Sequence, residues 1–182
     1  MELAKGELSE HFSTHNWQQS IGEYEQRIYN KSASLFSTAS ECGAVLSGVS
    51  ESQCGALKTY GFALGMAFQI MDDILDFQGT ESELGKPVGN DLINGTLTLP
   101  TLLFIQNHST EPLIQRLKNG DRDPKDLRRV VEMIRNSSAI DETMAFAERY
   151  RDQALESLSS LERGRARNSL QELADYATSR RT

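Results

Sequence analysis

Three carboxylates, Asp72, Asp73 and Asp76, stand inside an otherwise apolar run, FQIMDDILDF. A buried carboxylate without a counter-charge is costly, so a positive partner is expected beside them. On a helix, Asp72 and Asp76 share a face, and Gln69 lies one turn before Asp72 on the same side. Asp73 is rotated by about 100° from Asp72, toward the edge of that face. Mg²⁺ takes oxygen ligands, typically one or two carboxylates together with substrate phosphates. The spacing therefore predicts that the three aspartates hold magnesium and a phosphorylated substrate.

Two lysines could supply cations that bind the phosphate oxygens directly. Lys86 follows the aspartates in GKPVGND, where Gly85 and Gly89 would let the backbone approach an anion closely. Lys31 stands among small and apolar residues in YNKSASLF. Either lysine alone is more often a solvated side chain, and the aspartates alone could form a solvated acidic face. Taken together, the acids and the lysines predict a magnesium–diphosphate site.

Long helical patterns must position these residues. Apolar residues recur at steps of three and four along 17–49, as one helix or two in series, and along 53–77, which carries the aspartates. A glycine-rich loop is expected at 79–91. Pro100 is expected to disturb or restart the next helix, and Pro124 follows an N-cap-like aspartate. Further helical patterns lie at 92–107, 111–118, 140–161 and 165–177. The sequence therefore predicts an all-α antiparallel helical bundle, one domain over residues 1–182.

Composition restricts the partners and the compartment. The 182 residues carry a formal net charge of −7, which argues against a nucleic-acid partner because phosphate contacts need clustered cations. Cys42 and Cys54 form no CxxC pair, and no apolar run reaches the length of a membrane span. No leader pattern follows Met1. We therefore expect a cytoplasmic protein with no transmembrane segment.

Four motifs occur in a recognisable order: YNKSASLF, GMAFQIMDDILDF, GKPVGND and NGTLTLP. In order and spacing they resemble the trans-type polyprenyl diphosphate synthases, and LQELADYATSRR resembles the last helix of that family. The resemblance implies the isoprenoid synthase fold and a prenyltransferase of isoprenoid biosynthesis. Such an enzyme uses Mg²⁺ to ionise an allylic prenyl diphosphate, and the carbocation is attacked by isopentenyl diphosphate. A homodimer or a heteromer is also implied.

The resemblance also assigns roles residue by residue. The three aspartates match the second aspartate-rich motif of the family, which holds magnesium against the allylic diphosphate. Lys86 matches the lysine that binds this diphosphate after the motif, and Gln69 matches the residue just before it. Lys31 matches the lysine of the family's Lys-Thr pair, whose second member is Ser32 here. Lys31, Gln69 and Lys86 are therefore the expected catalytic residues, and together with Ser32 they are expected to bind the diphosphate.

One departure from the family is severe. No second D-D-x-x-D precedes residue 72, and the family's upstream residues for isopentenyl diphosphate are also missing from these 182 residues. Thr96 stands where many members carry another lysine. The resemblance therefore covers only the C-terminal part of the family, with the N-terminal helices missing. We expect the chain to be inactive when it acts alone.

Three other readings stay open from the sequence. The chain could be a non-catalytic or regulatory subunit of a heteromeric prenyltransferase, whose partner carries the first motif. It could be a terpene cyclase on the same fold, although GKPVGND followed by TLTLP argues against this. The least specific reading is a helical interaction domain without chemistry.

Overall fold

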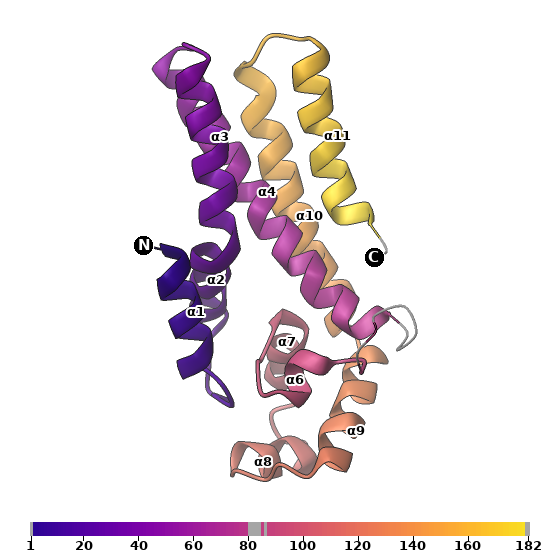
Figure 1. Ribbon diagram of the computed structural model, residues 1–182. Helices are drawn as coiled ribbons and strands as arrows, with labels where there is room; N and C mark the ends of the chain where they lie inside the picture. The colour runs from indigo at the N-terminus through magenta and orange to yellow at the C-terminus, as the bar shows by residue number, and fades with distance from the viewer. Residues whose placement is uncertain (1, 80–84, 86, 181–182) are drawn as a thin grey trace.

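The computed structural model describes residues 2–79, 85 and 87–180. All the regular elements in these ranges are helices, as predicted (Figure 1). The bounds are α1 (Glu2–Phe12), α2 (Ile21–Ile28), η1 (Tyr29–Ala33), α3 (Ser34–Leu46), α4 (Glu51–Gln78), α6 (Asn90–Ile93), α7 (Leu99–Asn107), α8 (Pro112–Lys118), α9 (Pro124–Arg135), α10 (Ala139–Ser157), η2 (Leu158–Ser160) and α11 (Arg165–Ser179).

The long helix α4 forms the centre of the bundle. It begins at a capping box, in which the Ser50 side chain accepts from the Gln53 backbone and the Gln53 side chain accepts from the Ser50 backbone. Figure 1 shows α3 along one side of α4 and α10 along the other, with α11 beside α10. The core includes Met66, Ile70 and Ile74, each at most 1% exposed. The aspartates of the motif lie in the last two turns of this helix, at the end opposite the cap.

The predicted helix at 17–49 begins four residues late. Trp17 is buried but precedes the helix, which starts after Ser20 caps it in a box with Glu23. The path then runs from α2 through a π-helical turn, η1, into α3. Such turns are rare and occur often at functional sites. This turn contains Lys31 and Ser32, two of the predicted site residues.

The segments after α4 cover its C-terminal end. Pro100 lies in the first turn of α7, so it restarts a helix after the short α6, one of the two outcomes expected. Asp123 caps α9 through its side chain, and Pro124 begins that helix as predicted. The N-terminal helix α1 was not predicted, because the hydrophobic periodicity of its sequence is weak.

Close packing of η1 and α3 against α4 depends on glycine. A Cβ built on Gly65 would lie 2.6 Å from the Ala33 Cα and 3.1 Å from the Phe36 Cβ. Residues at such contacts cannot gain a methyl group unless the helices move apart. In the same helix, a Cβ on Gly55 would meet no atom within 4 Å.

Gly65→Ala is therefore expected to lower the free energy of unfolding by about 1–3 kcal/mol, because it overpacks this contact. Gly55→Ala is the matched control. It is expected to raise the free energy of unfolding by as much as about 1 kcal/mol, because alanine is the better helix former. Urea unfolding followed by circular dichroism measures both variants. Equal effects of the two changes would show that the α3–α4 contact has room for a side chain.

Apolar side chains remain exposed on α3, at Leu35, Val45 and Leu46. Within the described ranges, α4 has no exposed large hydrophobic residue. Among the described residues, no helix is both long and apolar enough to cross a membrane.

Candidate functional site

The three aspartates of α4 lie in different environments. The Asp72 side chain is 51% exposed. Asp73 and Asp76 are each only 3% exposed. Gln69, Asp72 and Asp73 all line one cavity, and the Gln69 amide donates to Asp73, four residues later. The polar face of this helix is therefore centred on Asp73, and Asp72 lies at its edge.

Asp73 is held by donors from two helices. The Tyr24 hydroxyl of α2 donates to Asp73 Oδ2 at 2.6 Å. Gln69 Nε2 donates to Asp73 Oδ1 at 3.2 Å, and Ser32 Oγ donates to Gln69 Oε1 at 2.6 Å. Because Ser32 occupies the amide oxygen, the amide nitrogen of Gln69 faces the carboxylate. Ser32, Gln69 and Asp73 therefore form one hydrogen-bonded chain from η1 to α4.

Burial controls the protonation of Asp73. Desolvation raises the pKa of this carboxyl to about 7, opposed by the hydrogen bonds from Tyr24 and Gln69 and by the charge of Arg27. The neighbouring negative charge of Asp91 raises the same pKa further. A cation bound at this carboxylate would favour its ionised form. The site thus has a carboxylate whose charge needs further compensation.

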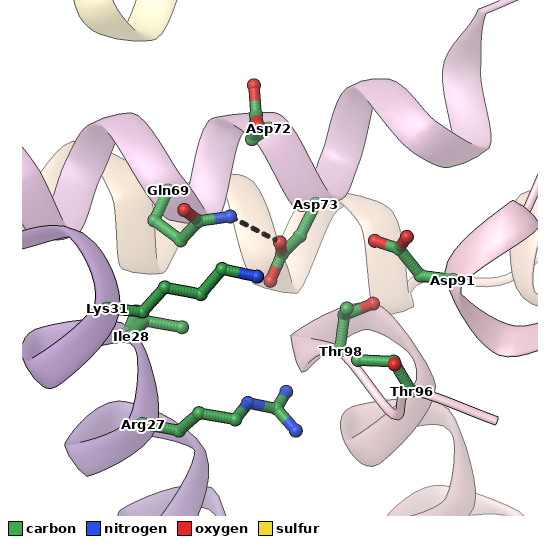
Figure 2. Close-up of a pocket in the computed structure, with 9 residues that line it drawn as sticks. All are labelled: Arg27, Ile28, Lys31, Gln69, Asp72, Asp73, Asp91, Thr96 and Thr98. Atoms are coloured by element: carbon green, nitrogen blue, oxygen red, sulfur yellow. Dashed lines mark hydrogen bonds between the residues drawn. The ribbon is translucent and has the colours of Figure 1, made fainter. Parts of the chain in front are cut away.

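A cavity of about 230 Å³ lies beside Asp73 (Figure 2). Its lining consists of Arg27, Ile28, Lys31, Gln69, Asp72, Asp73, Asp91, Thr96 and Thr98. Figure 2 shows the Lys31 ammonium pointing toward Asp73 from the opposite helix, and Arg27 reaching into the cavity from the same helical path. Carboxylates therefore line one wall and cations another, which suits an anion bound together with a metal ion.

Arg27 and Thr98 are among the lining residues that were not predicted. Arg27 is 4% exposed and donates to the Leu97 carbonyl at 2.7 Å, to Gln19 Oε1 at 3.3 Å and to Ser13 Oγ at 3.2 Å. The sequence did contain a signal for Arg27: it lies four residues before Lys31, so on a helix the two side chains share a face. Thr98 Oγ1 is buried and has no hydrogen-bond partner among the described residues, and Figure 2 shows it directed toward the space between Asp73 and Asp91.

Asp76 binds the segment that follows the motif. Its Oδ2 accepts from the Asp91 backbone N–H at 3.1 Å, and its carbonyl accepts from Gly89 N–H at 2.8 Å. Gly89 has a φ of 68°, and a Cβ there would lie 2.5 Å from Val131. Packing and a left-handed backbone thus account for this glycine, which was expected to approach an anion. Lys86, the other predicted cation, lies outside the described residues.

Asp72 has a charged partner from the C-terminal end. Arg180 Nη2 donates to Asp72 Oδ1 at 2.7 Å and to the Phe68 carbonyl at 3.0 Å. The Arg180 guanidinium also stacks over the Phe68 ring, 4.1 Å from its centroid. The arginine side chain is only 10% exposed, so α11 is joined to the aspartate motif by a largely buried cation.

The donor set fits part of a magnesium site. Among the described residues, no group of three or more His, Cys, Asp or Glu side chains is placed to hold a metal by itself. Asp72 and Asp73 nevertheless both line the cavity. Because magnesium commonly takes one or two carboxylates and completes its shell with waters and phosphates, these residues fit an ion shared with a diphosphate.

The chain is similar to known prenyl diphosphate synthases. Residues 1–134 match the family model described as polyprenyl synthetase. The heptaprenyl diphosphate synthase component 2 of Bacillus subtilis (strain 168) is 39% identical over 181 residues, which are 100% of this chain and 52% of the relative. The chain therefore spans about half the length of this curated relative.

Solved structures agree with the predicted fold. The crystal structure of heptaprenyl diphosphate synthase from Staphylococcus aureus matches with a TM-score of 0.94 and 37% identity, over 100% of this chain and 57% of that one. A polyprenyl synthase from Caulobacter crescentus CB15, complexed with calcium and isoprenyl diphosphate, matches with a TM-score of 0.89 and 38% identity, over 100% and 56%. The predicted isoprenoid synthase fold is confirmed for the part that the chain covers. This chain belongs to the polyprenyl synthetase family.

Proposed function

We propose that the chain forms the allylic-diphosphate half of a trans-type polyprenyl diphosphate synthase. The observation that carries the proposal is that Asp72 and Asp73 line the same cavity as Lys31 and Arg27. Relatives named as prenyl diphosphate synthases support it, as does the relative solved with calcium and isoprenyl diphosphate. The reaction of the whole enzyme would extend an allylic diphosphate by isopentenyl diphosphate.

Different residues of the cavity bind the metal ion and the phosphate groups of the substrate. Asp72 and Asp73 supply carboxylate oxygens to Mg²⁺, and Lys31 pairs with phosphate oxygens that the metal does not hold. When bound, Mg²⁺ supplies the counter-charge that lets diphosphate leave the allylic carbon. Ser32 and Gln69 act by orienting Asp73, which is less direct than the diphosphate contacts first expected for them. The role of Lys86 at the diphosphate and that of Asp76 as a third metal ligand stay predictions.

Thermal stability in the presence of ligands tests the proposal. Because a bound metal and a bound diphosphate each complete the site of the other, Mg²⁺ plus farnesyl diphosphate should raise the Tm of the chain by more than the sum of the two separate shifts. Differential scanning fluorimetry measures this, with NaCl of matched ionic strength as the control. Purely additive shifts, or none, would contradict the proposed site.

A heteromeric subunit is a second candidate function. The exposed Leu35, Val45 and Leu46 on α3 favour it, because such side chains are usually buried against another helix or chain. The relative from Bacillus subtilis is itself named as component 2. Both candidates use the same cavity, and they differ in whether the other metal-binding motif comes from a second polypeptide. A homodimer or a heteromer stays the predicted assembly, and the cytoplasm the predicted compartment.

A further inference from the structure

Tyr24 is a buried residue that the sequence motifs do not include. It lies on α2 with 0% exposure, and its hydroxyl donates to Asp73 Oδ2 at 2.6 Å. The Arg27 guanidinium lies over its ring, 5.6 Å from the centroid. Asp73 and Tyr24 are 49 residues apart in the chain, so this contact exists only in the folded bundle.

The two donors to Asp73 determine how its carboxylate is oriented. Gln69 binds Oδ1 from the same helix, whereas Tyr24 binds Oδ2 from α2. With one donor on each oxygen, rotation about the last side-chain bond would break at least one hydrogen bond. A carboxylate oxygen can accept more than one bond, so each oxygen keeps acceptor capacity for a ligand in the cavity.

A neutral donor suits a carboxylate that must also bind a cation. Tyr24 orients Asp73 without neutralising it, whereas Arg180 places a positive charge on Asp72.

We propose that Tyr24 is a positioning residue of the magnesium–diphosphate site, which orients Asp73 toward the cavity through its hydroxyl. The inference rests on the function proposed above and adds a residue on a different helix to it. Partners of this kind, which bind a metal ligand and not the metal, typically contribute 10–100-fold to metal affinity. The Tyr24 hydrogen bond also joins α2 to α4, the helix that carries the aspartates. The chain continues from α2 directly into η1, which contains Lys31.

Tyr24→Phe removes only the hydroxyl and keeps the packed ring. In the presence of saturating farnesyl diphosphate, this variant should bind Mg²⁺ about 10–100-fold more weakly, as measured by isothermal titration calorimetry. Tyr60→Phe is the matched control, because Tyr60 is 1% exposed and donates to the Leu170 carbonyl, away from the cavity. This control should keep the Mg²⁺ affinity of the unchanged chain, even if its Tm falls.

A double-mutant cycle separates positioning from general stability. In an Asp73→Asn background, Tyr24→Phe should change Mg²⁺ affinity by less than about twofold, because the carboxylate that it orients is already gone. Unchanged Mg²⁺ affinity in the single Tyr24→Phe variant would overturn the inference. So would an equal loss in Tyr60→Phe, or a full loss in the Asp73→Asn background. If the unchanged chain binds no Mg²⁺ with farnesyl diphosphate, the proposed function fails first, and the inference fails with it.

Discussion

Replacing Asp72 and Asp73 together by asparagine should abolish the joint stabilisation by Mg²⁺ and farnesyl diphosphate. Both carboxylates line the cavity, and asparagine keeps their shape while removing the charge that attracts the metal. We expect Mg²⁺ affinity to fall by at least about 100-fold, or about 2.7 kcal/mol at 1.36 kcal/mol per tenfold change. Calorimetry in the presence of farnesyl diphosphate measures the loss.

The same double variant should remain folded. The pKa of Asp73 is raised to about 7, so the native state binds more protons than the unfolded state between the ordinary pKa of the carboxyl and pH 7. Stability contributed by this group is therefore lost as the pH rises through that window, and at pH 8 its buried charge destabilises the metal-free chain. Asparagine removes this cost. The Asp72 side chain is 51% exposed, and asparagine at this position keeps an oxygen that can accept from Arg180.

A control for the change of charge is available on α10. Asp141 and Asp152 are exposed and lie outside the cavity, so Asp141→Asn/Asp152→Asn alters the net charge equally. This control should retain the joint stabilisation by both ligands. If the Asp72→Asn/Asp73→Asn variant retained it too, the cavity would not be the metal–diphosphate site.

The second large effect concerns turnover. Acting alone, the 182-residue chain is expected to give no measurable prenyl elongation. Catalysis of this kind depends on stabilising the departing diphosphate, and the loss of one preorganised donor already costs about 10²–10³ in rate. Within these residues, only one aspartate-rich motif occurs, and the upstream residues expected for isopentenyl diphosphate do not.

Incubation with farnesyl diphosphate, radiolabelled isopentenyl diphosphate and Mg²⁺ tests this expectation, with longer prenyl products as the readout. A full-length prenyl diphosphate synthase run in parallel shows that the assay works. Robust turnover by the purified chain would contradict the expectation. It would mean that residues with no assigned role replace the missing first aspartate-rich motif in binding magnesium.

The sequence alone was sufficient for features that depend on neighbours in the chain. The helix start at Asp123 follows from a side chain that caps the backbone N–H group two residues later. Pro100 marks the start of α7 for an equally local reason. The motif order that pointed to the family also follows from residue types and spacing.

Only the tertiary structure decided which aspartate lies at the centre of the site. At 3.6 residues per turn, Gln69, Asp72, Asp73 and Asp76 occupy one broad arc of α4, and helical geometry alone does not choose the buried side. The packing of α2 against α4 made that choice, because it places the Tyr24 hydroxyl on Asp73 across 49 residues. Asp72 is turned instead toward Arg180, 108 residues away. Contacts at these separations depend on how the helices pack, and no periodicity within a single helix encodes them.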